Sequence, residues 1–326
     1  MTFDERYQRY RAEADRRIIE LLERTDPASL YQPTRYVLEA GGKRVRAVLV
    51  MLAAEAVGGE PMAALDAGAA VEILHNFTLV HDDIMDRSAT RRGRQTVHTR
   101  WDEGTAILVG DVMIGIAYQI ILKGVQSRQP QVMAALSQGL VDVCEGQMLD
   151  KDFETRQNVC MDDYLQMVTM KTGRLLETAA EVGAQLGGGT PQQIAALCRY
   201  ARQLGIAFQI QDDLLDITAE AAELGKPIGG DVVEGKRTWL VVRALERATL
   251  PDDRQLLSRF LSAKGFPPEE VPAMRSLFQR NGVIEAAQQE VRLHTERAEQ
   301  ELQILPEGEP RQMLLWFTQM LLNRRF

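Results

Sequence analysis

Apolar residues recur along this chain at spacings of three and four, the period that places side chains on one face of an α-helix. The pattern is clear over residues 18–22 and again over residues 194–204. No Asn-Gly or Asp-Gly pair is flanked by runs that alternate between apolar and polar residues, the usual sign of a β-hairpin. The pattern therefore predicts long helices and few strands.

Glycine and proline divide these helices at a few short breaks. Proline is absent between Met62 and Gln129, which leaves room for several uninterrupted helices. Thr190-Pro191 predicts a helix that begins with a threonine cap and a proline at its first position. No shift in composition marks a linker. The sequence thus predicts an all-α protein with one domain over residues 1–326, a large helical bundle around a central cavity.

Composition and charge narrow the class of protein. The 326 residues are 45% hydrophobic and 26% charged, the balance of a soluble globular protein. The 46 Asp and Glu residues exceed the 38 Lys and Arg residues, giving a net charge of −8. A general nucleic-acid binder needs a basic surface to replace phosphate counterions, so we expect no nucleic-acid partner.

The cysteines and the apolar segments indicate the compartment. Cys144, Cys160 and Cys198 lie far apart and form no CxxC pair, which argues against a disulfide framework or a zinc site and favours a cytoplasmic protein. The charged N-terminus lacks the apolar core of a secretory signal. Residues 104–125 could span a membrane, but Asp111 would lie near the centre at a cost of roughly 2.5–3.5 kcal/mol. We expect a buried helix and no stable membrane insertion.

Two acidic clusters carry the first candidate chemistry. Asp82-Asp83-Ile84-Met85-Asp86 places three carboxylates broadly on one side of a helix, where they repel one another unless a cation holds them. Carboxylate oxygens suit Mg²⁺, which bridges them to substrate phosphates. One such cluster alone is more often a solvated acidic face. Asp212-Asp213-Leu214-Leu215-Asp216 repeats the spacing in an apolar setting, and the pair predicts two facing helices that hold several Mg²⁺ ions.

Positive residues near these clusters suit a diphosphate ligand. Gly41-Gly42-Lys43-Arg44-Val45-Arg46 presents three cations after a flexible turn, and Arg91-Arg92 follows one to two helical turns beyond the first acidic cluster. Guanidinium groups pair with phosphate oxygens in a two-bond fork. The glycine-rich segment lacks the GxxxxGK[ST] spacing of a P-loop, so nucleoside triphosphate hydrolysis is not indicated.

These motifs together resemble those of the trans-isoprenyl diphosphate synthases, the polyprenyl synthetase family, over roughly residues 35–240. The resemblance implies an isoprenoid synthase type I fold. At one position the chain departs from the family: Ala47 stands where proline is usual, and we expect it to loosen a turn without removing a ligand. The matching motifs, in order, are Gly41-Gly42-Lys43-Arg44-x-Arg46, Asp82-Asp83-x-x-Asp86 with Arg91-Arg92, Gly146-Gln147-x-x-Asp150, Lys171-Thr172, Phe208-Gln209-x-x-Asp212-Asp213-x-x-Asp216, Gly225-Lys226 and Gly235-Lys236.

The resemblance implies that the protein joins isopentenyl diphosphate to an allylic diphosphate, head to tail. About three Mg²⁺ ions would draw charge from the allylic diphosphate. It implies Asp82, Asp86 and Asp212 as the main metal ligands, and Asp83, Asp213 and Asp216 as metal-site residues that act through water or neighbouring hydrogen bonds. Thr172 and Gln209 would direct oxygens at the allylic carbocation.

The same resemblance divides the cations between two substrates. It implies Arg91, Lys171, Lys226 and Lys236 as contacts of the allylic diphosphate. It implies Lys43, Arg46, His75 and Arg92 as the metal-free pocket for isopentenyl diphosphate. On the residues alone, His75 is more often a core histidine that hydrogen-bonds within the protein.

Product length can be argued from the residues before Asp82. A growing tail that runs down this helix meets Phe77 about 7.5 Å along it, at 1.5 Å per residue. An aromatic ring at Phe77 with the smaller Thr78 beside it is similar to the pattern of geranylgeranyl (C20) synthases. We expect a C20 product, with farnesyl (C15) or longer products as alternatives.

Two other functions remain open from the sequence. A non-catalytic subunit of a hetero-oligomeric synthase generally loses an aspartate motif, whereas this chain keeps both. A class I terpene cyclase normally has an Asn/Ser/Glu metal motif in place of the second DDxxD. The resemblance also implies a homodimer, although nothing countable in the sequence locates its interface.

Overall fold

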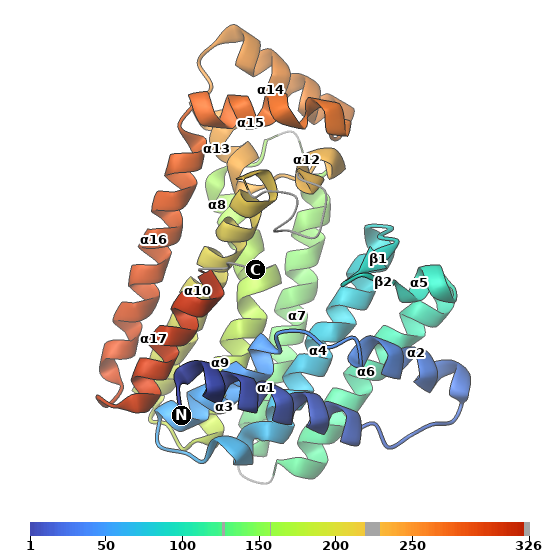
Figure 1. The fold of residues 1–326 in the computed structure, drawn as a ribbon, viewed down its shortest axis with the longest axis vertical. Coiled ribbons are helices and arrows are strands. Elements are labelled where there is room, and N and C mark those ends of the chain that lie inside the picture. Colours follow the sequence, from blue (N-terminus) through green and yellow to red (C-terminus); the bar gives the residue numbers. More distant parts are fainter. Residues whose placement is uncertain (126–127, 157, 219–228, 323–326) are drawn as a thin grey trace. The chain divides into compact units, whose positions relative to one another are not determined.

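A computed structural model of the chain describes residues 1–125, 128–156, 158–218 and 229–322 (Figure 1). Within these ranges the regular structure is almost entirely helical, which confirms the all-α prediction. The chain forms two compact units, each built from separate stretches. The first contains Met1–Leu140, Leu175–Cys198 and Ile304–Leu314, and the second Val141–Arg174, Arg199–Gln303 and Leu315–Phe326. A single domain over residues 1–326 stays a prediction.

The first unit is organised around α4, which is apolar on most of its faces. Residues on this helix from Leu65 to Leu74 are almost all buried, and α4 packs against α1, α3 and α6. Burying one such Leu or Ile side chain contributes about 1.5–3 kcal/mol, so packing rather than helix propensity fixes α4. The elements whose first residue lies in this unit are α1 (Phe3–Glu20), α2 (Ala28–Leu38), α3 (Val45–Ala56), η1 (Pro61–Ala64), α4 (Leu65–Met85), β1 (Thr90–Arg91), β2 (Arg94–Gln95), α5 (Val97–Arg100), α6 (Glu103–Gly124), α7 (Gln129–Phe153), α10 (Pro191–Thr218) and α17 (Glu309–Leu322).

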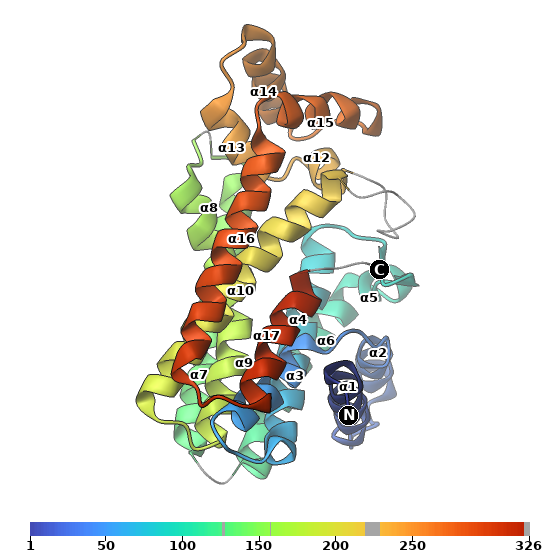
Figure 2. The ribbon, with the colours of Figure 1, turned by 60° about the vertical axis from the view of Figure 1, so that its left-hand side comes forward.

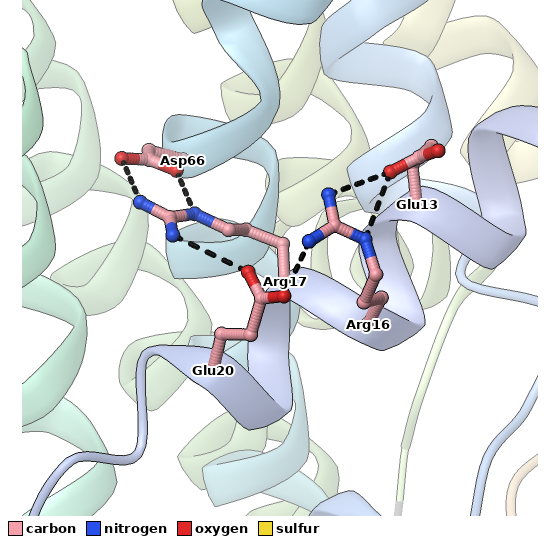
Figure 3. Close-up of polar contacts among 5 residues, drawn as sticks. All are labelled: Glu13, Arg16, Arg17, Glu20 and Asp66. Atoms are coloured by element: carbon pink, nitrogen blue, oxygen red, sulfur yellow. Dashed lines mark hydrogen bonds and ion pairs between the residues drawn. The ribbon is translucent and has the colours of Figure 1, made fainter.

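Ion pairs fasten the N-terminal helix α1 to α4. Arg17 on α1 donates two hydrogen bonds to the Asp66 carboxylate, from Nε at 2.6 Å and from Nη2 at 2.9 Å. Figure 3 shows this pair beside Arg16, which contacts Glu13 and Glu20 along the same helix. The Arg17 pair is a two-bond fork and only partly exposed, so it contributes more than the pairs along the surface of α1.

The second unit has its own apolar core. Trp239, Tyr164, Phe260 and Phe278 are buried together in it. Helix α16 runs beside α10 (Figure 2), where His294 lies 2.6 Å from Gln203 Oε1 and Arg199 pairs with Glu301 at 2.7 Å. The remaining elements are α8 (Met161–Val168), η2 (Thr169–Gly173), α9 (Arg174–Leu186), α12 (Gly230–Glu234), α13 (Trp239–Arg247), α14 (Pro251–Ala263), η3 (Pro268–Glu270), α15 (Val271–Arg280), α16 (Val283–Glu301) and η4 (Leu302–Ile304).

Two local predictions can be compared with the structure. The Thr190 cap is confirmed: α10 begins at Pro191, and the Gln193 N–H donates to Thr190 Oγ1 at 3.3 Å. The apolar segment over residues 104–125 forms α6, which by length and composition alone could cross a membrane. One face, which includes Ala106, Val109 and Met113, is buried as expected, but the opposite face is exposed.

Candidate active site

The glycine-rich segment before α3 uses its three cations differently. Arg44 is buried and has a left-handed backbone conformation, with φ of 49°. Its guanidinium donates to Asp15 Oδ1 and to the Leu38 carbonyl, both at 2.6 Å. Lys43 is exposed, and its carbonyl accepts a hydrogen bond from Tyr7 at 2.5 Å. Arg44 therefore anchors the segment, and Lys43 and Arg46 lie on either side of it.

The expectation that Ala47 loosens a turn is wrong. Ala47 lies inside α3 and is fully buried. Its N–H donates to Glu72 Oε2 at 3.2 Å, and the other oxygen of Glu72 lies 3.9 Å from Arg44 Nη1. A proline has no N–H to give to this buried carboxylate. Alanine at this position therefore adds a link between α3 and α4.

Arg46 and His75, both in the first unit, each place a polar nitrogen out of contact with solvent. Arg46 Nε and His75 Nδ1 are buried, and neither has a hydrogen-bond partner among the residues that the structure describes. Burial lowers the pKa of Arg46 to about 10. Burial, with the nearby charges of Arg46 and Arg92, holds the pKa of His75 well below its usual value. A charged guanidinium and a neutral imidazole without partners suit an anionic ligand rich in acceptors.

The first acidic cluster lies at the end of α4. The helix ends at Met85 with Asp86 as its C-cap, and Arg87 follows at a φ of 52°. The expectation that Arg91 and Arg92 lie on further turns of this helix is wrong. They lie on a short antiparallel hairpin in which Arg91 pairs with Arg94, and its turn has positive φ at Arg92 and Gly93. Sequence rules missed the hairpin because Arg-Gly is not a usual turn pair and no apolar alternation surrounds it.

The hairpin places Arg91 beside the first acidic cluster and Arg92 beside the glycine-rich segment. Arg91 Nε donates to Asp83 Oδ1 at 2.7 Å, and Arg92 donates to the Gly41 carbonyl. A Cβ on Gly42 would come within 3.1 Å of the Arg92 guanidinium, so glycine there lets the side chain lie against the backbone. Asp83 is thus buried and ion-paired, whereas Asp82 is half-buried and Asp86 is exposed.

Asp212 and Asp213 of the second acidic cluster line a polar cavity of about 170 Å³ within the second unit. Helices α7, α8 and α10, the η2 turn and the segment before α13 supply its walls. Asp212 is exposed, Asp213 is buried and Asp216 is half-buried. The lining residues are Asp150, Tyr164, Met167, Val168, Lys171, Thr172, Gln209, Asp212, Asp213, Asp231, Lys236, Arg237 and Thr238.

Asp213 is held by neutral donors. Tyr164 Oη donates to it at 2.7 Å, Gln209 Nε2 at 2.9 Å and the Trp239 N–H at 2.9 Å. The last donor belongs to the first turn of α13, where the helix dipole favours a carboxylate. Burial nonetheless raises the pKa of Asp213 to about 6.

Lys171 and Thr172 lie on η2, a single π-helical turn that widens the helix locally. Lys171 Nζ pairs with Asp150 at 2.5 Å. A Cβ on Gly146 would lie 2.4 Å from the Lys171 nitrogen, so glycine there permits the close approach of α7. The Thr172 hydroxyl donates to Gln209 Oε1 at 2.9 Å, which orients the amide whose NH₂ group reaches Asp213.

Sequence reasoning missed Asp231 and Tyr164. The Asp231 N–H donates to Asp216 Oδ2 at 3.2 Å, and its carboxylate lies 3.8 Å from Lys236 Nζ. Burial and the neighbouring aspartates raise its pKa well above the usual value. An acidic residue after Gly229-Gly230, five positions before Lys236, is the signal that could have found it. No local pattern indicates Tyr164, because only folding brings α8 to α10.

The structure therefore gathers the predicted residues into two sets. In the first unit, Asp83 contacts Arg91, Arg92 contacts the glycine-rich segment, and Arg46 lies near His75 and Arg92. In the second unit, Lys171, Thr172, Gln209, Asp212, Asp213 and Lys236 line one cavity. Lys226 lies outside the described residues.

The aspartates fit a hard divalent cation by their donor chemistry. Over the described ranges, no three carboxylate, imidazole or thiol side chains lie close enough to hold an ion by themselves. Mg²⁺ usually takes one or two protein carboxylates and completes its shell with water and substrate phosphates. Asp82, Asp86 and Asp212 are more exposed than Asp83 and Asp213, so they are the carboxylates that fit such a partial shell.

Comparisons with known proteins agree with this arrangement. The family model described as Polyprenyl synthetase matches residues 27–277. A short chain isoprenyl diphosphate synthase of Methanothermobacter thermautotrophicus is 40% identical over 319 residues, covering 97% of each chain. A geranylgeranyl diphosphate synthase of Methanosarcina mazei is 46% identical over 77% of this chain and 78% of its own. A geranylfarnesyl diphosphate synthase of Natronomonas pharaonis is 37% identical over 92% and 91%.

Solved structures give the same result. The geranylgeranyl pyrophosphate synthetase of Pyrococcus horikoshii superposes with a TM-score of 0.92 at 35% identity, covering 99% of each chain. A decaprenyl diphosphate synthase of Rhodobacter capsulatus reaches 0.90 at 32% identity, over 99% of this chain and 98% of its own. Fold, aspartate motifs and relatives agree: the chain belongs to the polyprenyl synthetase family, whose members are prenyltransferases that make isoprenyl diphosphates.

Proposed function

We propose that this protein is a Mg²⁺-dependent prenyltransferase that condenses isopentenyl diphosphate with allylic diphosphates, head to tail, to give all-trans geranylgeranyl diphosphate (C20). One observation carries the proposal: both DDxxD motifs are complete, and each lies beside cations in its own unit. A non-catalytic subunit has no need for both.

In this proposal Asp82, Asp86 and Asp212 would be the main ligands of about three Mg²⁺ ions, which when bound would supply positive charge to the leaving diphosphate. Asp83 and Asp213 act through water or hydrogen bonds, which their present partners support, because Arg91 holds the first and Tyr164 the second. Asp216 also acts through water or hydrogen bonds, and it accepts one from the Asp231 N–H.

The other residues hold the two diphosphates. Arg91, Lys171, Lys226 and Lys236 contact the allylic diphosphate. Lys43, Arg46, His75 and Arg92 bind isopentenyl diphosphate without metal, which the buried partnerless atoms of Arg46 and His75 support. Electrostatic stabilisation of the departing diphosphate supplies most of the rate.

The condensation itself needs no covalent intermediate with the protein. The allylic C–O bond breaks, the isopentenyl double bond attacks the cation, and a proton passes to the departing diphosphate. Thr172 and Gln209 direct their oxygens at the cation, and their mutual hydrogen bond supports a fixed orientation. Excluding water prevents quenching of the cation.

Product length is set at Phe77 in this proposal. Its ring is 6% exposed on α4, five residues before Asp82, and the Thr78 hydroxyl is turned to the His75 carbonyl at 2.8 Å. A ring at the first position and a small side chain at the second support a C20 limit. C15 and longer products are the alternatives, since relatives of several product lengths match this chain.

We further propose a cytoplasmic homodimer. Among the described residues Cys144, Cys160 and Cys198 form no disulfide, as in a reducing compartment. The exposed face of α6 carries Ile107, Leu108 and Leu122, each about half exposed, which is the kind of surface that a second copy covers. Light scattering of Leu108→Lys tests this: the wild type is expected as a dimer and the variant as a monomer.

One incubation tests the proposed reaction. Labelled isopentenyl diphosphate is mixed with C5, C10 or C15 allylic diphosphate, with Mg²⁺ or with EDTA, and the dephosphorylated products are sized by chromatography. A Mg²⁺-dependent C20 alcohol is expected, and Phe77→Ala should lengthen it. Another linear length overturns only the role of Phe77. A cyclic hydrocarbon, or no product from any primer, overturns the reaction.

A further inference from the structure

His81, directly before the first aspartate motif, lies against α6. Its Nε2 is 3.2 Å from the Ile107 carbonyl oxygen and 4.0 Å from Asp111 Oδ1. Helices α4 and α6 pack extensively against each other. His81 is therefore one of the side chains through which these two helices meet.

Gly110 on α6 makes room for this imidazole. A Cβ built on Gly110 would lie 2.1 Å from His81 Nε2, 2.5 Å from Cδ2 and 2.9 Å from Cε1. Carbon atoms do not approach this closely, so any other residue at 110 would displace the ring. Gly115, one turn and a half further along α6, has no atom within 4 Å of the same position and serves as a natural control.

A second contact of His81 is Phe77. The two rings are one helical turn apart on α4 and meet edge to face, with centroids 5.5 Å apart and planes at 87°. This is a favourable arrangement for aromatic rings. Phe77 is thus supported on one side by His81, which is itself supported by the bare backbone at Gly110.

We propose that His81 and Gly110 determine product length by positioning the ring of Phe77. His81 acts as a wall behind the ring, and Gly110 lets that wall lie flush with α6. The inference rests on the proposed function, because it requires that Phe77 ends the growing chain. With Phe77 alone, product length would be set by α4. In this proposal α6 also contributes to it, through Gly110.

The test compares product lengths rather than rates, because His81 adjoins a proposed metal ligand. His81→Ala should let the Phe77 ring turn away, and we expect at least a threefold rise in the ratio of longer to wild-type product. Gly110→Ala should push the imidazole onto Phe77 and change the same ratio at least threefold. Gly115→Ala, which gains the same methyl group on the same helix, should leave it unchanged. Light scattering checks that all variants keep one oligomeric state.

Double variants separate this mechanism from general damage. Without the imidazole there is nothing for the new methyl group to strike, so Gly110→Ala should have no further effect when added to His81→Ala. Likewise His81→Ala should add nothing to Phe77→Ala. Additive effects in either pair would overturn the proposal, as would equal changes in Gly110→Ala and Gly115→Ala.

The outcomes also distinguish the inference from the proposed function. If the wild type makes no prenyl product, the proposed function fails. If Phe77→Ala lengthens the product but His81→Ala does not, the function and the role of Phe77 stand and only the positioning by His81 fails.

Discussion

The two DDxxD motifs have the same spacing but different surroundings. In the first, the middle carboxylate Asp83 is paired with a cation, Arg91, whose side chain is 38% exposed. In the second, Asp213 is only 4% exposed and accepts from three neutral donors. Arg91 can turn to water or to a phosphate, whereas the buried Tyr164 hydroxyl and the buried Trp239 N–H cannot. We infer that the first region adapts to its ligand and that the second is preorganised.

The cations follow the same division. Those of the first region are arginines and a lysine on a hairpin and a glycine-rich segment, held in place by α1 through Asp15 and Tyr7. Those of the second pair with local acids, Lys171 with Asp150 and Lys236 with Asp231 and Glu234. If a substrate phosphate took the place of these local acids, Lys171 and Lys236 would be paired with a negative group both before and after substrate binding.

The largest expected effect follows from removing one proposed metal ligand from each region. Asp82→Asn and Asp212→Asn should each lower kcat/KM by about 10²–10³-fold or more, because each takes a negative oxygen from the metal shell that stabilises the leaving group. Steady-state kinetics at several Mg²⁺ concentrations would measure this. Circular dichroism should show an unchanged fold. A variant that keeps most of its activity at every Mg²⁺ concentration would remove its aspartate from the proposed ligand set.

Replacing the buried aspartate of each region should lower the free energy of unfolding by different amounts. Asp213→Ala leaves two buried donors and the half-buried Gln209 amide without an acceptor, whereas Asp83→Ala leaves Arg91, which can reach water. We expect Asp213→Ala to lower the free energy of unfolding by about 2 kcal/mol more than Asp83→Ala, in urea titrations without Mg²⁺. Equal losses would mean that the two regions are equally preorganised.

A third effect concerns the anchoring of the first region by α1. Asp15→Asn removes the charged partner of buried Arg44, next to Lys43. We expect about a fivefold rise in KM for isopentenyl diphosphate, the equivalent of roughly one hydrogen bond, with little change in KM for the allylic substrate. Asp66→Asn is the matched control, because it breaks a different ion pair of α1 without touching the glycine-rich segment (Figure 3). The same rise in both variants would assign the effect to α1 as a whole.

The smallest effect is a difference in pH dependence. The pKa of Asp213 is raised from 3.8 to about 6, so its protonation stabilises the fold below 3.8 and this contribution is lost as pH rises through about 6. The pKa of His75 lies well below 6.5, so its contribution is present above 6.5 and is lost as pH falls.

Unfolding in EDTA from pH 7 to pH 4 would measure both contributions. As the pH falls, protonation of Asp213 adds to the free energy of unfolding of the wild type, and Asp213→Asn should lack this gain. The neutral His75 lowers the free energy of unfolding of the wild type over the same range, and His75→Gln should lack this loss. Slopes that change in the same direction in the two variants would contradict the assignment of neutral imidazole to one region and a protonating carboxylate to the other.

The sequence predicted the fold class and the chemistry because both depend on local patterns. Spacings of three and four determined the helices, and the Thr190-Pro191 start of α10 followed from capping rules. The motifs indicated a prenyl diphosphate synthase because each needs a few residues at fixed spacing. The roles assigned to single residues, such as the metal ligation by Asp82 or the chain limit at Phe77, stay predictions.

Only the tertiary structure decided which of these residues are anchored and which face a ligand. In the sequence Arg44 looks like one of three equivalent cations. In the structure it is buried and donates to Asp15 on α1 and to a carbonyl of α2. The Arg91–Arg92 hairpin, the Tyr164 bond to Asp213 and the fit of His81 on Gly110 join residues 8 to 49 positions apart. Local patterns predict most of the helices, but whether a charge is paired or buried depends on side chains that other elements bring to it.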